Sequence, residues 1–207
     1  IRKRGDRSNN RKASIMIDQF IKLDPKIQAL SQETEQECKG IFQRIDEICA
    51  YNEAKVLSAF MECGVSETHF KGSTGYGYGD RGREVLDEVL AKITGAEDAL
   101  VRHNFVSGTH ALSVALFGIL RAGDTMVSLT GAPYDTMEEV IGIRGKGNGS
   151  LKDFGVSYRQ IDLTAEGKVD YERIPEAVKG CKVAYIQRSR GYSLRESISV
   201  SEIGEIV

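Results

Sequence analysis

The stretch that decides the fold is Val101-Arg-His-Asn-Phe-Val-Ser-Gly-Thr-His110, followed by the apolar run from Ala111 to Leu120. It predicts a short strand over residues 99–105, a tight turn and then an apolar helix. The helix is indicated by apolar residues that recur three and four positions apart after the turn. The stretch therefore has the strand–turn–helix form that a parallel α/β sheet repeats.

The turn at Ser107-Gly108-Thr109 allows two interpretations. Gly108 lets the backbone turn sharply and approach a ligand closely. The amides of Gly108, Thr109 and His110 would lie in the first turn of the helix, where they have no intrahelical partner and the helix dipole favours a phosphate. The alternative is that Ser107 only caps the helix. This stretch alone favours neither interpretation over the other.

Composition places the chain among ordinary globular proteins. It has 207 residues, which suits one or two domains, and 41% of them are hydrophobic, which is enough for a sizeable core. The formal net charge of -2 gives no electrostatic argument for nucleic acid or an anionic membrane as partner. The four cysteines form no C-x-x-C pair, and neither a secretory signal nor a long apolar run is visible. We therefore expect reduced thiols and a cytoplasmic protein without a metal site.

The first third of the chain, residues 1–64, is predicted to be a helical segment. Residues 14–62 carry apolar side chains at helical spacing, and we expect several separate helices there. Asp24-Pro25 suggests a break, Thr34 has capping-box spacing to Glu37, and Asn52 suggests a further start.

A glycine-rich loop follows over residues 71–83, and its Gly77, Gly79 and Gly82 match G-x-G-x-x-G. A dinucleotide fingerprint needs an apolar strand immediately before it, and the preceding residues are polar, so that interpretation is rejected. Tyrosines and arginines alternate with the glycines, and such side chains can clamp a phosphate. The alternative is a surface turn.

From residue 99 onward, expected strands alternate with expected helices. The strands cover about 99–105, 125–129, 156–160 and 182–187, which predicts an α/β fold with a mostly parallel sheet and helices on both faces. Ligands bind at the carboxyl edge of such a sheet. Tyr134 lies where a strand end meets a helix start, so it is either a ring that stacks on a planar cofactor or a packing residue.

Five motifs in this order resemble the pyridoxal 5'-phosphate (PLP)-dependent methionine gamma-lyase family of aluminium-resistance-type proteins, relatives of cystathionine beta- and gamma-lyases. Each motif is weak alone, and the five together, in order and at sensible spacing, are a strong signal. They are Gly75-Tyr-Gly-Tyr-Gly-Asp-Arg-Gly-Arg83, Ala99-Leu-Val-Arg102, Ser107-Gly-Thr-His-Ala111, Gly131-Ala-Pro-Tyr-Asp-Thr136 and Ile186-Gln-Arg-Ser-Arg-Gly-Tyr-Ser193.

The resemblance implies a fold-type I PLP enzyme, a homodimer or homotetramer, of which residues 65–207 form part of the large domain. Its cofactor would be pyridoxal 5'-phosphate and its substrate a small sulfur-containing amino acid. By resemblance, Tyr134 would stack on the pyridine ring, and a Tyr and an Arg of the 76–83 loop in a neighbouring subunit would complete the phosphate site. The implied phosphate residues are Ser107, Gly108 and Thr109, with Tyr78 and Arg83 from the neighbour; the implied pocket residues are Gln187, Ser189, Arg190 and Tyr192.

One departure from the family pattern limits this expectation. The family's Schiff-base lysine and the aspartate that pairs with the pyridine nitrogen lie in motifs beyond Val207, as does the small C-terminal domain. No catalytic residue is therefore identified, and we expect the chain alone to be inactive. The full-length activity implied is carbon–sulfur bond cleavage. The alternatives are another PLP-dependent transferase, or a non-catalytic dimerisation or binding fragment.

Overall fold

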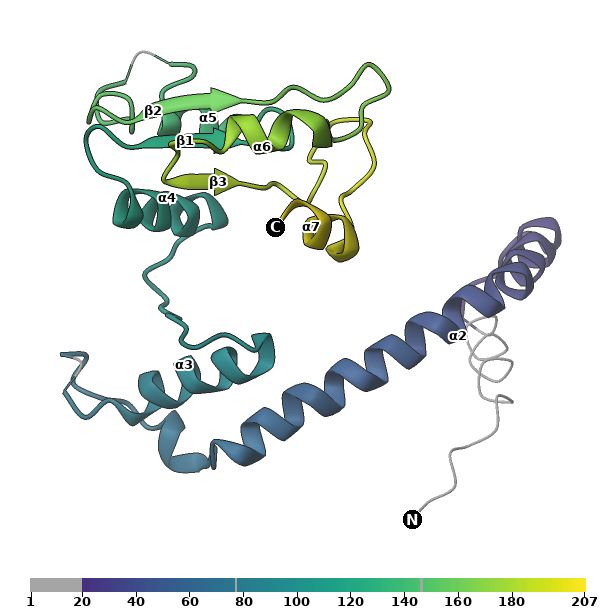
Figure 1. Cartoon of the computed structure of the whole chain (residues 1–207). Helices are drawn as coiled ribbons and strands as arrows, with labels where there is room; N and C mark the ends of the chain where they lie inside the picture. The colour runs from purple at the N-terminus through teal and green to yellow at the C-terminus, as the bar shows by residue number, and fades with distance from the viewer. Residues whose placement is uncertain (1–19, 77, 146) are drawn as a thin grey trace. The chain divides into compact units, whose positions relative to one another are not determined.

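The computed structural model describes residues 20–76, 78–145 and 147–207, which form two compact units. The N-terminal unit contains the described residues up to Val101 and is helical (Figure 1). The C-terminal unit, residues 102–207, contains the sheet. The expected division of the chain into a helical segment, residues 1–64, and part of a large domain, residues 65–207, stays a prediction.

A single helix, α2 (Pro25–Glu62), replaces the several helices expected in the N-terminal unit (Figure 1). It begins where the break was predicted, because the Asp24 carboxylate accepts the Lys26 amide and Pro25 fits the first helical position. The predicted starts at Thr34 and Asn52 are wrong. Their side chains donate instead to the carbonyl oxygens of Leu30 (2.9 Å) and Ile48 (2.8 Å), one turn back in the same helix. Of the first short helix expected before that break, residues 14–19 lie outside the described residues, and residues 20–23 are not helical.

A short 3-10 helix, η1 (Glu67–Phe70), and α3 (Arg81–Thr94) complete the N-terminal unit. Residues 84–93, whose apolar side chains recur at helical spacing in the sequence, lie within α3. Asp80 caps α3, and Gly95 ends it in the left-handed conformation with φ of 72°. The buried Val85 and Val89 of α3 and Ala59 of α2 supply the unit's small core.

The strand predicted over residues 99–105 is not formed. The backbone N–H of Val101 donates to the Asp87 carboxylate (2.7 Å), and the N–H of Phe105 donates to the Arg102 carbonyl (3.2 Å) in a turn. A side chain and a turn therefore take up donors that a strand would present to its neighbour.

The C-terminal unit is built on three parallel strands: β1 (Thr125–Ser128), β2 (Ser157–Gln160) and β3 (Val183–Tyr185). Their order is β2-β1-β3, and Met126 lies opposite both Tyr158 and Val183 (Figure 1). The predicted parallel sheet is confirmed, with three strands in place of four.

Helices cover both faces of this sheet, as predicted (Figure 1). On one face, α4 (Gly108–Ile119) and α5 (Asp135–Ile141) pack on Met126. On the other, η2 (Tyr171–Arg173), α6 (Ile174–Ala177) and α7 (Val200–Ile206) lie against the side of Val127. Met126 and Val127 point to opposite faces and are both 0% exposed, so the central strand is buried on both sides.

Two pairs of residues in this unit have capping-box spacing in the sequence, Asp135 with Glu138 and Ser199 with Glu202, and they differ in the structure. The box of Ser199 and Glu202 is present at the start of α7. The box of Asp135 and Glu138 is absent, because Asp135 is already the first helical residue and its carboxylate accepts the Thr136 amide (2.8 Å). The cap of α5 is Tyr134, whose backbone carbonyl accepts the amides of Met137 and Glu138.

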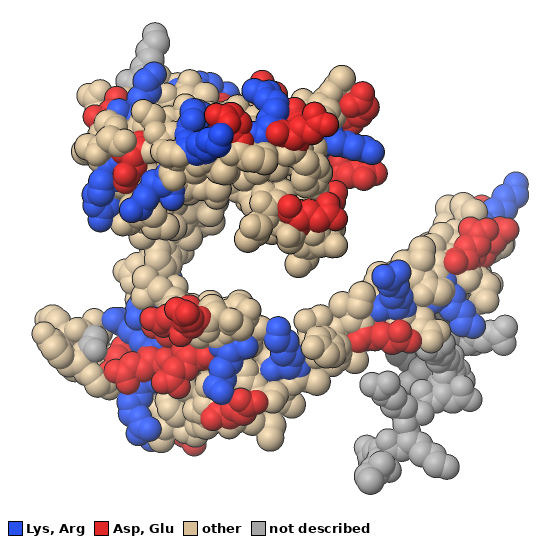
Figure 2. Space-filling model, in the orientation of Figure 1, with Lys and Arg blue, Asp and Glu red and all other residues tan. Residues whose placement is uncertain are grey.

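Charges of both signs are interspersed over the face of the molecule shown in Figure 2. Within residues 20–76, 78–145 and 147–207, no helix combines the length and the hydrophobicity needed to cross a bilayer. The four cysteines are free thiols.

The side-chain hydrogen bonds of Asn52 within α2 and of Ser199 at the start of α7 predict different effects when each residue is replaced by alanine. Asn52→Ala should leave the free energy of unfolding unchanged or raise it by about 0.5 kcal/mol, because Ala is the better helix former. Ser199→Ala, which removes a true cap, should lower it by about 1 kcal/mol. Urea unfolding followed by circular dichroism measures both; a loss at Asn52 as large as at Ser199 would show that a helix starts there.

Candidate functional site

The loops after β1 and β3 leave the same edge of the sheet. The pairing of β1 with β3 continues past the end of β1, since the amide of Leu129, the residue after β1, donates to the carbonyl of Tyr185, the last residue of β3 (2.9 Å). The Gly131 amide donates to the carbonyl of Ile161 (3.1 Å), the residue that follows β2. This carboxyl edge is where open parallel sheets bind ligands.

The start of α4 leaves two backbone donors free. The Ser107 hydroxyl accepts the His110 amide (3.1 Å), and the Ser107 carbonyl accepts the Ala111 amide (3.1 Å). The amides of Gly108 and Thr109 have no acceptor within the part of the chain that the structure describes. Gly108 is exposed, and a Cβ there would meet nothing within 4 Å. Ser107 therefore caps the helix, as one interpretation of the turn expected. The phosphate interpretation stays a prediction, and the two remaining backbone donors are compatible with it.

The starts of α4 and α5 lie side by side. The Thr109 hydroxyl donates to the Thr136 hydroxyl (3.1 Å), and the two helices share one core cluster through Leu116 and Met137. Tyr134, the cap of α5, is packed against the same cluster. The turn at Gly108 and the ring of Tyr134 therefore belong to the same side of the sheet.

Gln187 joins the loop after β3 to the loop after β1. Its side-chain oxygen accepts the Tyr134 amide (2.8 Å), and its backbone amide donates to the Thr130 hydroxyl (2.9 Å). Its side-chain nitrogen donates to the Ser189 carbonyl (3.2 Å). Gln187 is buried, and both polar atoms of its side chain are used within the protein.

The other end of Tyr134 is held by the same segment. Its phenol is hydrogen-bonded to the Ser189 hydroxyl, and either group can donate. The ring packs against Gly191, whose φ is 57°. A Cβ at Gly191 would lie 2.8 Å from the ring carbon Cε1 of Tyr134, so the close approach requires glycine.

The other predicted pocket residues of this segment are Arg190 and Tyr192. Arg190 and Tyr192 are exposed, Tyr192 almost completely, and the structure shows no hydrogen bond from either side chain to a described residue. Arg195, which the sequence did not single out, donates from Nη2 to the carbonyl oxygens of Gln187 (2.9 Å) and Ser189 (2.8 Å). Thr130 and Thr136 were missed too. Thr130 lies outside the five motifs, and Thr136 ends one of them without a predicted role.

The glycine-rich loop belongs to the N-terminal unit, so the structure does not test whether it meets the start of α4. Tyr76 and Tyr78 are exposed, and the Arg83 guanidinium forms an ion pair with Asp80 (Nε to Oδ2, 3.0 Å). The Ser73 hydroxyl donates to the same carboxylate (2.9 Å). Gly77 lies outside the described residues.

Two tyrosines beneath the site have pKa values shifted by burial. Burial raises the pKa of Tyr158 to about 12, although a hydrogen bond to Ser128 acts in the opposite direction. Burial, and next the neighbouring Tyr134, raise the pKa of Tyr185. Burial lowers the pKa of the Arg195 guanidinium. The sheet face below Tyr134 therefore presents neutral phenols.

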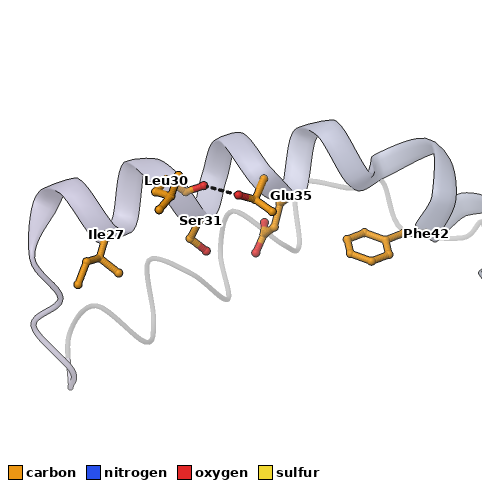
Figure 3. Close-up of a pocket in the computed structure, with 6 residues that line it drawn as sticks. Ile27, Leu30, Ser31, Glu35 and Phe42 are labelled. Carbon is orange, nitrogen blue, oxygen red and sulfur yellow. Dashed lines mark hydrogen bonds between the residues drawn. The ribbon is translucent and has the colours of Figure 1, made fainter. Parts of the chain in front are cut away.

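Other candidate features carry no comparable chemistry. A shallow groove runs along α2 (Figure 3), and its lining consists of Ile27, Leu30, Ser31, Thr34, Glu35 and Phe42. The hydrogen bond drawn there is the one from Thr34 to the Leu30 carbonyl. Of the residues that the structure describes, no group of three or more His, Cys, Asp or Glu side chains is arranged to hold a metal ion.

Comparisons with known proteins show what the chain is similar to. Residues 27–207 match the family model of methionine gamma-lyase. YnbB of Bacillus subtilis, a protein without an assigned activity, is 49% identical over 179 residues, which are 86% of this chain and 42% of YnbB. A structure from Listeria innocua, a candidate cystathionine beta-lyase involved in aluminum resistance, is 47% identical with a TM-score of 0.84, over 87% of this chain and 45% of its own.

A third relative is the carbon-sulfur lyase involved in aluminum resistance from Clostridium novyi NT. It is 43% identical with a TM-score of 0.84, over 91% of this chain and 46% of its own. The chain therefore spans less than half the length of these three relatives.

The half-buried phenol of Tyr158 predicts a pH dependence of stability. Its folded pKa of about 12 is above the ordinary value near 10, so its contribution is complete below pH ~10 and is lost as the pH rises towards ~12. Tyr158→Phe should therefore lose less stability than the wild type between pH ~9 and ~11. Urea midpoints at the two pH values measure this, with Tyr192→Phe as a hydroxyl deletion at an exposed ring. Equal losses in Tyr158→Phe and wild type would contradict it.

Proposed function

The chain belongs to the methionine gamma-lyase family, and on that premise we propose that it binds pyridoxal 5'-phosphate at the carboxyl edge of its sheet. The observation that carries the proposal is the pair of free amides, Gly108 and Thr109, at the start of α4. Two backbone donors and the positive end of a 12-residue helix form a site for a phosphate.

The residues present fit the cofactor's phosphate. Open space at the Cα of Gly108 lets an anion approach the backbone, and the Thr109 hydroxyl stands beside it, held by Thr136. Ser107 keeps its own hydroxyl engaged with His110 and so fixes the first turn of the helix. The role proposed for Ser107 is to hold the backbone amides of Gly108 and Thr109 in place.

Tyr134 is proposed to cover the pyridine ring. Its backbone is fixed by Gln187 and its phenol by Ser189, so the ring enters the site already oriented. Stacking between aromatic rings contributes about 0.5–1.5 kcal/mol beyond the burial of area. An oriented ring loses little conformational entropy when the ligand binds.

For the whole protein we propose carbon–sulfur lyase activity on a sulfur-containing amino acid. When bound, PLP supplies the electron sink that such a cleavage needs. The side chains of this unit would orient that group, and the hydroxyl pair of Tyr134 and Ser189 can hold or pass a proton at the phenol oxygen. Arg190 and Tyr192, both exposed, are proposed to face the substrate.

We also propose that the protein acts as a homo-oligomer in the cytoplasm. Ile41, Ile45 and Ile48 lie on one side of α2 at helical spacing and are each about half exposed or more. An apolar stripe of this kind is typical of a surface that another chain covers. In that assembly Tyr78 and Arg83 are proposed to reach the phosphate of a neighbouring subunit.

A pair of substitutions at Gly108 tests the phosphate site. Gly108→Pro removes one amide donor and suits the first position of a helix, and the extended Ser107 before it tolerates proline. It should weaken PLP and inorganic phosphate binding by about tenfold or more, the effect of losing a hydrogen bond to a charged group. Gly108→Ala keeps the amide and places its methyl in open space, so it should bind as the wild type does.

Equilibrium dialysis with pyridoxal 5'-phosphate and with inorganic phosphate measures both variants. Equal binding by Gly108→Pro and Gly108→Ala would exclude the amide as a ligand. In the whole protein loaded with PLP, Gly108→Pro should lower the release of an α-keto acid from a sulfur-containing amino acid. If the wild-type protein released none, the lyase proposal would fail and the binding proposal would be judged by the dialysis alone.

A further inference from the structure

Arg195 forms three hydrogen bonds to backbone carbonyl oxygens near the carboxyl edge of the sheet. Nη2 donates to the carbonyls of Gln187 (2.9 Å) and Ser189 (2.8 Å), and Nη1 donates to the carbonyl of Glu196 (2.8 Å). The side chain is half-buried. The guanidinium therefore bridges the segment after β3 back to the residues that precede α7.

Arginine is suited to this arrangement. Its guanidinium is planar and presents five donors in a fixed fork, so one group can bind carbonyls two residues apart. Lysine has a flexible stem and a point charge, which does not fix two acceptors relative to each other. The geometry of Arg195 thus sets the distance between the Gln187 and Ser189 carbonyls.

These two residues hold the two ends of Tyr134. The Gln187 side chain accepts the Tyr134 backbone amide (2.8 Å), and the Ser189 hydroxyl is bonded to the Tyr134 phenol. Gln187 itself is anchored to Thr130 after β1. A shift in the backbone of residues 187–189 would therefore move both ends of the tyrosine.

We propose that Arg195 is a positioning residue that sets the orientation of the Tyr134 ring through the backbone of Gln187 and Ser189. The inference rests on the proposed function only in taking that ring to cover the pyridine ring of PLP. It assigns Gln187 a corresponding part, which is to hold the tyrosine rather than to contact the substrate.

The positioning is tested first without any ligand. In Arg195→Met, the hydrogen-bonded amides of Tyr134, Gln187 and Gly191 should exchange with solvent deuterium at least about tenfold faster, as expected when hydrogen bonds to a charged group are lost. Amides of β1 should keep their rates. Arg188→Met, in the same segment with an exposed side chain, is the matched control and should exchange as the wild type does. Unchanged exchange at Tyr134 in Arg195→Met would overturn the proposal.

Binding of two ligands then separates positioning from a general loss of structure. Arg195→Met should weaken pyridoxal 5'-phosphate about threefold to tenfold, the range that the loss of an aromatic stack gives. It should leave inorganic phosphate unaffected, because the amides of Gly108 and Thr109 do not depend on the ring. In a Tyr134→Ala background, Arg195→Met should have no further effect on PLP. Equal weakening of both ligands, or an undiminished effect in that background, would contradict the proposal.

A second variant covers the case in which Arg195→Met fails to fold. Arg195→Lys retains the charge and most of the stem but not the fork, and it should show the same selective loss at a smaller size. Wild-type exchange and PLP affinity in Arg195→Lys would exclude a role for the fork. If Tyr134→Ala itself left PLP binding unchanged, the stacking part of the proposed function would fail, while the exchange experiment would still decide whether Arg195 holds the tyrosine.

Discussion

The hydrogen bond from the Tyr134 amide to the Gln187 side chain joins the two loops from which the candidate site is built. One loop follows the central strand β1 and the other follows β3, its parallel neighbour. Since parallel strands release their loops at one edge, the bond becomes possible only in this sheet order. The burial of Gln187 makes it costly to lose, because an unpaired buried amide costs about 1–3 kcal/mol.

The same constraint explains which residues of the C-terminal unit pack in the core and which form the candidate site. β1 is buried on both faces, so it contributes packing through Met126 and Val127 and leaves the chemistry to the residues that follow it. The helix starts of α4 and α5 then face the edge, joined through Thr109 and Thr136. The proposed phosphate site at one start and the ring of Tyr134 at the other therefore adjoin one core cluster.

Much of this arrangement could be predicted from the sequence, because it depends on local signals. Apolar periodicity placed the helices, the short apolar runs placed β1, β2 and β3, and Ser199 with Glu202 marked the start of α7. The failures arose where one local signal had two outcomes. Asn52 can cap a helix or bond back into one, and only the continuity of α2 decides between them. The apolar run after Ala99 resembled a strand, yet the long-range bond from Val101 to Asp87 takes its backbone donor.

The candidate site was predictable to a similar extent. Ser107, Gly108, Thr109 and Tyr134 carry motif signals, and the structure brings them to one side of the sheet. Thr130 and Thr136 act through bonds to residues 57 and 27 positions away, which local patterns do not reveal. Arg195 bonds to backbone carbonyls six and eight residues back, and no sequence pattern marks an arginine for that. The positions of Tyr78 and Arg83 relative to the site depend on a second unit and stay predictions.

The backbone amides of Gly108 and Thr109, at the start of α4, are proposed to form an anion site. Nuclear magnetic resonance of the isotopically labelled chain, titrated with inorganic phosphate at constant ionic strength, tests it directly. We expect the amide resonances of Gly108 and Thr109 to shift most, to saturate together and to give one dissociation constant, while those of β1 stay in place. Shifts spread over surface lysines and arginines, with Gly108 and Thr109 unmoved, would contradict it.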